Sequence, residues 1–376
     1  MPRWVLSANY LLFFAILGLV VPYLGLFLTG RGFNGEQIGL VLALFMATRV
    51  VSPNLWAWLA DRLGQRARIV RAGALLSLLC FLPLLFSRGA LVTVVALVAF
   101  SFFWTAILPQ LEAITLALLG DERAQYARMR AWGSVGFIVT SAAAGTLLGW
   151  WGSEALVPMG LALLLGLLAT TSGVRDLADN SSDERLASEA GGFRQPRLWL
   201  LLLSMLLLQI SHGPYNGFYV LYLLDHGRSS GMAGVLVGLG VVAEIVLFLY
   251  SARLLARYPL VKLLLIAYGL SVVRWLGIAA TPDHLPLLAL WQLLHAASFA
   301  LAHAVAIQLV HANFVPANRS RGQAFYLSFC YGLGGVFGSL YTGWLWQDGA
   351  GGQLSFLIAA AFAGGALLVG WRLLRS

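Results

Sequence analysis

Two oppositely charged residues, Glu112 and Arg130, stand eighteen positions apart, each inside a long apolar stretch of the chain. If residues 118–125 form the turn between two antiparallel helices, both charges lie on the order of 6–9 Å inside the same helix ends. Such a pair either locks two helices together as a structural ion pair or binds a polar solute. Because an ionisable side chain inside an apolar helix is costly, it predicts a functional site by default.

A second set of ionisable side chains follows later in the chain. Glu244 lies about halfway along an apolar stretch, where an ionised carboxylate is costly. Arg274, His295 and His303 lie in the next two apolar stretches. A carboxylate that takes up a proton when its Arg or His partner moves away would couple proton entry to a conformational change. Either histidine can equally be a hydrogen-bonded packing residue, so the proton-coupling role is a hypothesis.

Other residues inside apolar stretches are candidates for solute binding. His212, Tyr215 and Asn216 surround a Gly-Pro pair, which bends a helix and exposes polar groups. Arg49 has no obvious sequence neighbour to pair with, so it either faces the interior and attracts an anion or bonds to carbonyl groups of the eleventh helix. Trp132 stands where an aromatic ring would stack on a solute, and it can equally be a packing residue.

The composition sets the environment in which these residues act. The chain has 376 residues, of which 60% are hydrophobic and only 10% are charged. A water-soluble surface needs more charge than this, so the composition predicts an integral membrane protein. The net charge of +9 does not indicate nucleic-acid binding, because the basic residues are spread between apolar stretches. Cys80 and Cys330 lie far apart in apolar stretches, which indicates no disulfide framework.

The apolar stretches are long enough to cross a bilayer as helices. We predict an all-α fold of twelve transmembrane helices, and their expected ranges are 5–28, 36–59, 69–87, 91–118, 128–150, 155–174, 198–224, 232–254, 260–280, 286–312, 322–346 and 353–372.

The positions of the basic residues predict the orientation of these helices. With twelve spans, eighteen Lys and Arg residues fall on the side of the two termini, against Arg31, Arg88 and Arg228 on the other. The positive-inside rule then puts both termini in the cytoplasm. We therefore expect a multi-pass protein of the bacterial inner membrane, in contact with the lipid bilayer.

The twelve predicted helices divide into two halves, residues 1–174 and 198–376, joined by a polar linker, 175–197. The halves resemble each other at an offset near 195 residues, which sets Arg49 opposite Glu244. Two parallel six-helix repeats with a solute site between them form a known transporter architecture.

A short motif after the second predicted helix supports this architecture. The sequence AWLADRLGQRAR, residues 57–68, resembles the G-x-L-A-D-R-x-G-R-R signature of the major facilitator superfamily. Asp61, Arg62, Gly64 and Arg66 match the signature, whereas Ala57 and Gln65 depart from it. The resemblance implies that this loop helps to gate the alternation between two states. From the residues alone, we expect Asp61 to cap the third helix and to pair with a nearby arginine.

Longer sequence runs are similar to those of particular transporter families. The run YARMRAWGSVGF, with Glu112 before it, resembles lactose permease and related proton symporters. Over nearly its full length the chain resembles the 3-phenylpropionic acid transporter family, on this run and on VVAEIVLF, VVRW and LLHAASFALAHA. The resemblance implies solute or proton roles at matching positions: Glu112, Arg130, Glu244, Arg274, His295 and His303.

Together these observations predict a secondary transporter rather than an enzyme. An enzyme would need acid and base groups that converge at one membrane surface, and the loops here are short. We expect proton symport of an aromatic carboxylate such as 3-phenylpropionate. Symport of an oligosaccharide or nucleoside, and efflux by proton antiport, stay open. We expect no cofactor, because the proton gradient drives transport. We also expect a monomer that binds neither a metal nor nucleic acid.

Overall fold

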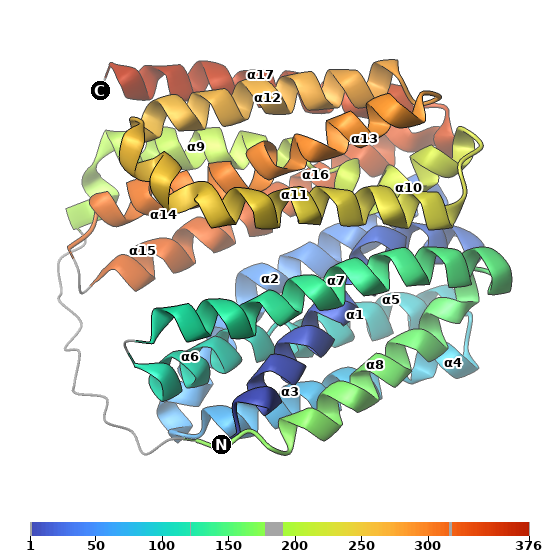
Figure 1. Cartoon of the computed structure of the whole chain (residues 1–376). Helices are drawn as coiled ribbons and strands as arrows, with labels where there is room; N and C mark the ends of the chain where they lie inside the picture. Colours follow the sequence, from blue (N-terminus) through green and yellow to red (C-terminus); the bar gives the residue numbers. More distant parts are fainter. Residues whose placement is uncertain (1, 121, 177–190, 316–317, 376) are drawn as a thin grey trace.

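The computed structural model describes residues 2–120, 122–176, 191–315 and 318–375, and within them all regular structure is helical (Figure 1). The α-helices are α1 (Arg3–Gly30), α2 (Gly35–Leu63), α3 (Arg66–Phe81), α4 (Pro83–Phe86), α5 (Ala90–Trp104), α6 (Ile107–Leu119), α7 (Arg123–Trp151), α8 (Leu156–Thr171), α9 (Pro196–Ser211), α10 (Tyr215–Asp225), α11 (Ser230–Arg257), α12 (Leu260–Ala280), α13 (Leu285–Leu293), α14 (Ala302–Ala312), α15 (Arg319–Tyr326), α16 (Gly334–Trp346) and α17 (Gly352–Trp371). Two π-helical segments, Ala296–Leu301 and Leu327–Leu333, join α13 to α14 and α15 to α16.

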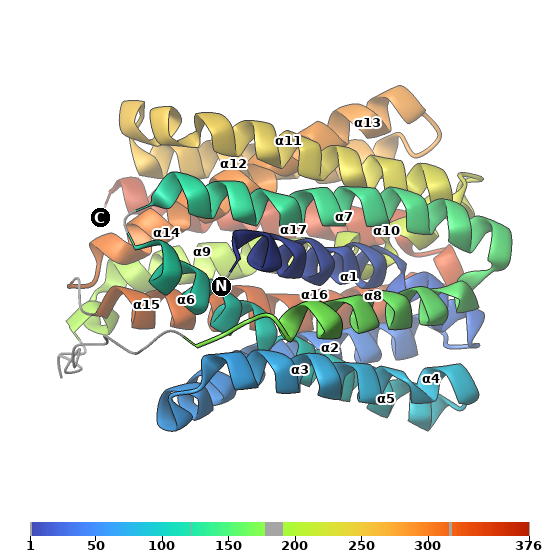
Figure 2. The ribbon, with the colours of Figure 1, turned by 60° about the horizontal axis from the view of Figure 1, so that its bottom comes forward.

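The described elements form twelve passes along one bundle axis. Among the described residues, eleven helical stretches are long and apolar enough to cross a membrane. The stretch from α15 through α16, residues 319–346, adds a further pass. Both chain ends lie toward the same end of the bundle, which an even number of passes requires (Figures 1 and 2). We call this end the terminal end and the opposite one the distal end.

Several passes are interrupted where the chain cannot complete its helical hydrogen bonds. Pro109 has no N–H to donate to Thr105, and α5 and α6 are separated at that point. Pro214 likewise lies in the break between α9 and α10, where the N–H of Gly213 donates to the carbonyl of Ile210. The fourth and seventh predicted helices are therefore each two helices with an interruption between them.

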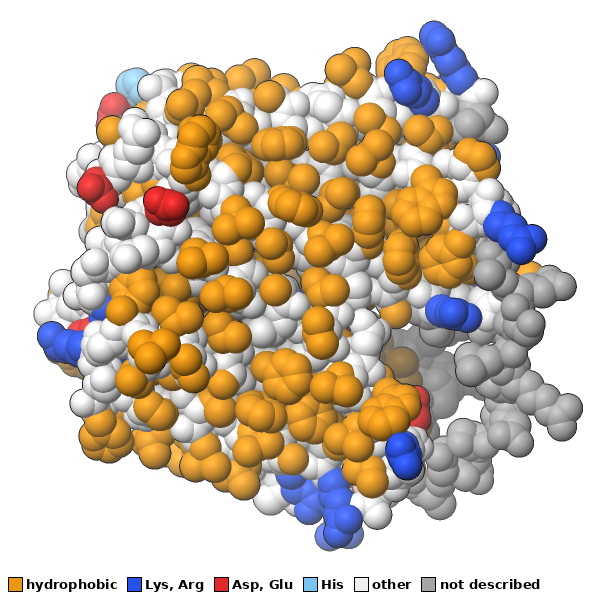
Figure 3. Space-filling model, turned by 180° about the vertical axis from the view of Figure 1, so that it is seen from behind, with side chains coloured by type: hydrophobic (Ala, Val, Ile, Leu, Met, Phe, Trp, Pro, Cys, Tyr) orange, Lys and Arg blue, Asp and Glu red, His pale blue; other side chains and the backbone are white. Residues whose placement is uncertain are grey.

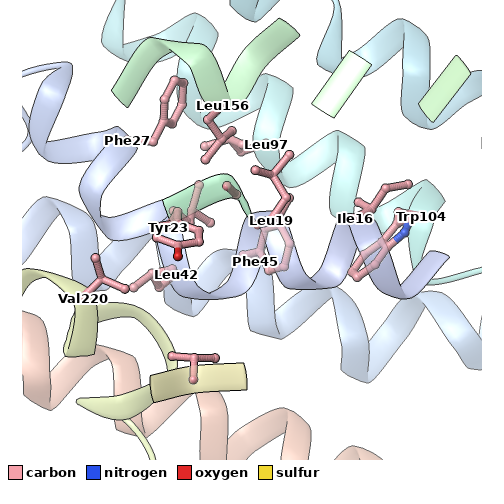
Figure 4. Close-up of a cluster of buried hydrophobic side chains, with 14 of the residues drawn as sticks. Ile16, Leu19, Tyr23, Phe27, Leu42, Phe45, Leu97, Trp104, Leu156 and Val220 are labelled. Atoms are coloured by element: carbon pink, nitrogen blue, oxygen red, sulfur yellow. The ribbon is translucent and has the colours of Figure 1, made fainter. Parts of the chain in front are cut away.

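The helices form two groups, α1–α8 and α9–α17, which lie side by side (Figure 1). We call them the first half and the second half. One buried core fills the first half and continues into the distal part of the second half, for example through Val220 and Trp275. Figure 4 shows this continuity, with Tyr23 and Leu42 of the first half near Val220. A separate core fills the terminal part of the second half. The halves therefore share a core only toward the distal end.

Close backbone contacts hold the distal ends together. A Cβ on Gly39 of α2 would lie 2.7 Å from the Cα of Gly343 on α16, so only glycine permits this approach. The Ser230 hydroxyl of α11 donates to the carbonyl of Gly145 on α7, at 2.7 Å. The Tyr23 hydroxyl donates to the carbonyl of Ser141, at 2.6 Å, and approaches the carbonyl of Ser230. The contacts Gly39–Gly343, Ser230–Gly145 and Tyr23–Ser230 connect the two halves directly, whereas the Tyr23–Ser141 bond lies within the first half.

Fewer contacts join the halves near the terminal end. The Asn54 amide of α2 donates to the Ser328 hydroxyl at 3.3 Å, and both groups are at the surface. In Figure 3 the surface is notched between the halves at this end, on the right of that view. The same view shows hydrophobic side chains across the broad face and Lys and Arg side chains near the terminal end, the pattern of a membrane-embedded protein.

The structure corrects the expected boundaries around the sequence motif. Asp61 and Arg62 lie in the last turn of α2, which runs to Leu63 instead of ending at residue 59. Gly64 ends the helix in a left-handed conformation, with φ of 61°. Asp61 does not cap α3, and its carboxylate pairs with Arg66 at 2.9 Å, both groups being exposed.

Asp176 at the start of the predicted linker takes the capping position instead. Its carboxylate accepts a hydrogen bond from the N–H of Ala67, in the first turn of α3, at 2.7 Å. Residues 177–190, the central part of the predicted linker, lie outside the described residues.

Candidate functional site

The structure brings Glu112 of α6 and Arg130 of α7 together, as their spacing predicts. The Nε atom of Arg130 lies 3.5 Å from a carboxylate oxygen of Glu112. The exposed fractions of the two side chains, Arg130 and Glu112, are 31% and 35%, so solvent or a solute can reach both groups. The Arg130 guanidinium also lies over the ring of Phe14 on α1, 4.0 Å from its centroid.

Glycines in the YARMRAWGSVGF run bring α1 close enough to make this arrangement. A Cβ on Gly133 would lie 2.7 Å from the Phe14 ring, the ring that covers Arg130. A Cβ on Gly136 would collide with the carbonyl of Leu11. Beside these contacts, Tyr10 of α1 donates its hydroxyl hydrogen to Thr115 of α6 at 3.1 Å. The ion pair is therefore held at the meeting point of α1, α6 and α7.

In the second half, Glu244 and His295 form a closer and more buried pair. The Nε2 atom of His295 lies 2.8 Å from a carboxylate oxygen of Glu244. The exposed fractions are only 13% for Glu244 and 9% for His295. A nitrogen and an oxygen atom at this distance form a hydrogen bond. A neutral imidazole can donate to the carboxylate, and uptake of one more proton makes the pair neutral overall.

Local backbone features place His295 against Glu244. His295 immediately precedes the π-helical segment Ala296–Leu301, a type of helix irregularity that is common at functional sites. Gly240, one turn before Glu244 on α11, leaves room for the imidazole, because a Cβ there would lie 3.1 Å from its ring.

Arg274 of α12 is completely buried next to this pair. Its guanidinium donates to the Ser298 hydroxyl at 2.9 Å and to the amide oxygen of Gln292 at 3.3 Å. It also lies over two aromatic rings, 4.3 Å from the centroid of Tyr215 and 4.4 Å from that of Trp275. Within the described part of the chain, no carboxylate lies within 4.0 Å of Arg274. Its positive charge is therefore balanced only at longer range.

Gln292 connects Arg274 to the seventh pass. It accepts a hydrogen bond from the Tyr215 hydroxyl at 3.0 Å and donates to the Tyr219 hydroxyl at 2.7 Å. Gln292 and Ser298 were not predicted from the sequence. The available signal was their polarity inside apolar stretches, which alone does not separate site residues from packing residues.

The remaining predicted residues of the seventh pass lie at the same break. His212 is buried, its Nδ1 bonds to the carbonyl of Leu208 at 2.9 Å, and its Nε2 has no hydrogen-bond partner among the described residues. Its ring centroid lies 6.5 Å from that of His295. Asn216, on α10, is partly exposed. The structure thus gathers His212 and Tyr215 around His295 and Arg274.

His303 lies apart from the Glu244–His295 pair. Its Nδ1 is 3.0 Å from the Tyr331 hydroxyl and 3.3 Å from the Tyr326 hydroxyl. No carboxylate among the described residues lies within 4.0 Å of its ring nitrogens. Its proton-coupling role stays a prediction, and the contacts here are those of a histidine bound by tyrosine hydroxyls.

The two other predicted binding residues differ in where they point. Trp132 is 49% exposed and shares a face of α7 with the exposed residues Val135 and Val139. Because Arg130 lies on the opposite face, the geometry does not support a stacking role for Trp132, which stays a prediction. Arg49 of α2 is partly exposed, and its described contact is the ring of Phe45 at 6.0 Å.

Comparison with known proteins agrees with this architecture. The sequence matches the model of the MFS_1 like family over residues 3–358. The chain belongs to this family of major facilitator transporters. It is thus a multi-pass membrane protein and a secondary transporter, not an enzyme, and the predicted fold is confirmed.

Two named proteins show the similarity at the sequence level. The chain is 30% identical over 352 residues to the "Probable 3-phenylpropionic acid transporter" of Escherichia coli (strain K12), covering 92% of this chain and 91% of that protein. It is 27% identical over 377 residues to the maltose permease of Geobacillus stearothermophilus, covering 93% and 89% of the two chains.

Solved structures show the same fold at lower identity. The crystal structure of the nucleoside transporter NupG aligns with a TM-score of 0.87 at 20% identity and covers 100% of both chains. The structure titled "In meso crystal structure of the POT family transporter PepTSo" aligns with a TM-score of 0.80 at 10% identity, covering 100% of this chain and 98% of that one. At these identities the likeness establishes the fold alone.

Proposed function

We propose that this transporter is a proton-coupled symporter that carries a small organic solute through the bacterial inner membrane by alternating access. The observation that supports it most is the 2.8 Å contact between Glu244 and His295 inside the bundle. A proton taken up by this pair removes one negative charge from a site where charge is costly. The protonated and unprotonated carriers then differ by one charge, before the charge of the solute is counted.

The solute would bind between the halves, where Glu112 and Arg130 are accessible. An arginine can hold a carboxylate through two parallel hydrogen bonds, and Glu112 can accept hydrogen bonds from hydroxyl groups. Tyr215, Asn216 and His212 would supply polar groups from the second half. Among solutes, an aromatic carboxylate such as 3-phenylpropionate is favoured, because the relative of 30% identity is named for that acid.

The described structure fits one of the two end states of alternating access, the state that is closed at the distal end. The halves share a core and hydrogen bonds at the distal end and have few contacts near the terminal end. With both termini in the cytoplasm, as the positive-inside rule predicts, this arrangement is an inward-facing state. Asp61, Arg62, Gly64 and Arg66 would then act at the cytoplasmic end of α2 and α3. The carrier would work as a monomer without a cofactor.

The alternative solutes and directions have observable consequences. Similarity to a maltose permease favours an oligosaccharide as the second candidate. In a symporter, the side from which solute leaves becomes more alkaline, whereas in an antiporter that side becomes more acidic. The direction of a solute-induced pH change therefore separates uptake by symport from efflux by antiport.

The test measures this pH change in proteoliposomes. Wild type, Glu244→Gln and the control Glu36→Gln, at the exposed distal start of α2, are each given 3-phenylpropionate, maltose or a nucleoside on one side. We expect 3-phenylpropionate to alkalinise its own side with wild type and with the control, but not with Glu244→Gln. Solute movement without a pH change in all three proteins would show a facilitator and refute proton coupling.

A further inference from the structure

Arg49 stands on the side of α2 that faces the interior of the bundle. Leu44 and Val51 mark the outward face of α2, because both are exposed hydrophobic side chains. Viewed down the helix axis, the side chain of Arg49 points in nearly the opposite direction from theirs. On the flanks of this inner face, Met46 and Val50 pack toward Gly335 and Gly332 of the eleventh pass. Three other α2 residues pack toward α5, namely Phe45, Thr48 and Ser52.

The Arg49 guanidinium has no polar partner among the described residues. No hydrogen bond or ion pair is found for it there, and the Phe45 ring 6.0 Å away is a distant contact. The side chain is partly exposed, so water can reach it in this state. The alternative that Arg49 bonds to carbonyls of the eleventh pass is not what the structure shows. By contrast, Arg71 of α3 bonds to the carbonyl of Ala67 in its own helix.

Arg49 also lies at the depth of the other charged groups. Arg49 is fourteen residues from Gly35 at the distal start of α2, and Glu244 is fourteen residues from Ser230 at the distal start of α11. At 1.5 Å per residue, each is about 21 Å from the distal end of its helix. Arg130 is fifteen residues from Gly145, which contacts Ser230. The three charges therefore occupy one layer of the bundle.

The charges inside the bundle favour an anion. Arg49, Arg130 and Arg274 supply three positive charges, and Glu112 and Glu244 supply two negative ones. The histidines add none when neutral. The interior then has one surplus positive charge, and a proton at the Glu244–His295 pair raises the surplus to two. A neutral solute would leave that surplus in place, whereas a monocarboxylate restores the charge of the empty carrier.

We propose that Arg49 binds the carboxylate of the solute and selects anionic solutes over neutral ones. This inference rests on the proposed symport of a small organic solute and adds the residue that determines its charge class. The fork of an arginine fits a carboxylate through two hydrogen bonds, which a lysine cannot reproduce. A carboxylate bound at Arg49 also lies at the depth of Arg130, so the positive charge of Arg130 adds to the attraction for the same anion. One proton moves with each carboxylate, so the cycle moves no net charge.

The test compares an acid with its uncharged amide. Binding of 3-phenylpropionate and 3-phenylpropanamide is measured by titration calorimetry on the purified full chain in detergent, for wild type, Arg49→Gln, Arg49→Lys and the control Arg71→Gln. We expect wild type and Arg71→Gln to prefer the acid. The affinity of Arg49→Gln for the acid should fall by about tenfold to a hundredfold, because a charged hydrogen-bond partner of the carboxylate is removed. Its affinity for the amide should be at least that of wild type. Arg49→Lys should fall between.

The other outcomes identify which step is wrong. If Arg49→Gln keeps the acid-to-amide ratio of wild type, Arg49 does not bind the carboxylate, while the symport proposal stands. If wild type binds neither compound, the assignment of Arg49 is overturned, and the pH-change experiment with maltose and nucleosides decides independently whether symport survives. If Arg49→Gln does not fold, as judged by size-exclusion chromatography, the same ratio in Arg49→Lys decides, because lysine keeps the charge and loses the fork.

Discussion

The two halves of this transporter place their charges in different surroundings. In the first half, Glu112 and Arg130 are each about one-third exposed and 3.5 Å apart. In the second half, Glu244 and His295 are nearly buried and 2.8 Å apart, next to a fully buried Arg274. An exposed pair with a loose contact can exchange its partner for a solute at small cost. A buried, hydrogen-bonded cluster resists such exchange, because removal of one partner leaves another unsatisfied.

This difference suggests a division of roles between recognition and coupling. A group that meets different solutes must be reachable from water, which fits the first half. A group that holds a proton until the carrier changes state must be shielded from water, which fits the second half. A mutation that neutralises the first-half pair should therefore impair solute binding, whereas one that neutralises the second-half pair should impair proton coupling.

The largest expected effect is the loss of solute exchange in Arg130→Gln. We expect its kcat/KM for solute exchange across proteoliposomes to fall by about a hundredfold, since hydrogen bonds to charged groups contribute about 1.5–3 kcal/mol. Glu244→Gln should keep exchange within a few fold of wild type, because exchange needs no net proton movement. Equal losses in the two variants would refute the division of roles.

The next largest effect concerns stability, in Arg274→Lys. Arg274 donates to Ser298 and Gln292 through a planar fork, and a lysine cannot make both bonds in the same geometry. We expect a loss of about 2–3 kcal/mol in the free energy of unfolding. Arg130→Lys, at a partly exposed pair, should cost under about 1 kcal/mol. The measurement is thermal unfolding in detergent, and a smaller loss for Arg274→Lys than for Arg130→Lys would contradict the comparison.

A moderate effect is expected at the distal end, which joins the two halves. Ser230→Ala removes the hydroxyl of α11 that donates across the halves to the carbonyl of Gly145 on α7. The loss of about 1 kcal/mol should shift the population toward the state open at the distal end by about fivefold. Distances between spin labels at the distal ends of α2 and α16 would report the shift. Ser251→Ala, which removes a hydroxyl that bonds, among the described residues, only to the carbonyl of Phe248 in its own helix, is the matched control.

The sequence was sufficient for the fold and for the first charged pair. The lengths of the apolar stretches and the side on which basic residues fall depend on local composition, so twelve passes were predictable. The Glu112–Arg130 contact followed from the length of one turn between antiparallel helices. The placement of Glu244 against His295 was not predictable from spacing, because it depends on the π-helical segment after His295 and on the space left by Gly240.

Directions around a helix were predictable only in part. Arg49 and Trp132 are both mid-helix residues with a plausible site role, yet Arg49 faces the interior and Trp132 shares the exposed face of Val135. Nearly uniform hydrophobicity removes the periodic signal that marks the inner face of a helix in a soluble protein. For the same reason, the sequence alone could not identify Gln292 and Ser298 as the hydrogen-bond partners of Arg274.

The smallest expected effect separates two carboxylates at the terminal end of the first half. Asp176 caps α3 through the N–H of Ala67, and its replacement by alanine should cost about 1 kcal/mol in the free energy of unfolding. Asp61→Asn breaks only an exposed pair with Arg66 and should cost less than about 0.5 kcal/mol. If Asp61→Asn nonetheless slows transport with unchanged stability and unchanged solute affinity, Asp61 acts in the change of state, as the sequence signature implies. If rate, affinity and stability all stay at wild-type values, the pair has no gating role, and recognition and coupling depend on the interior charges alone.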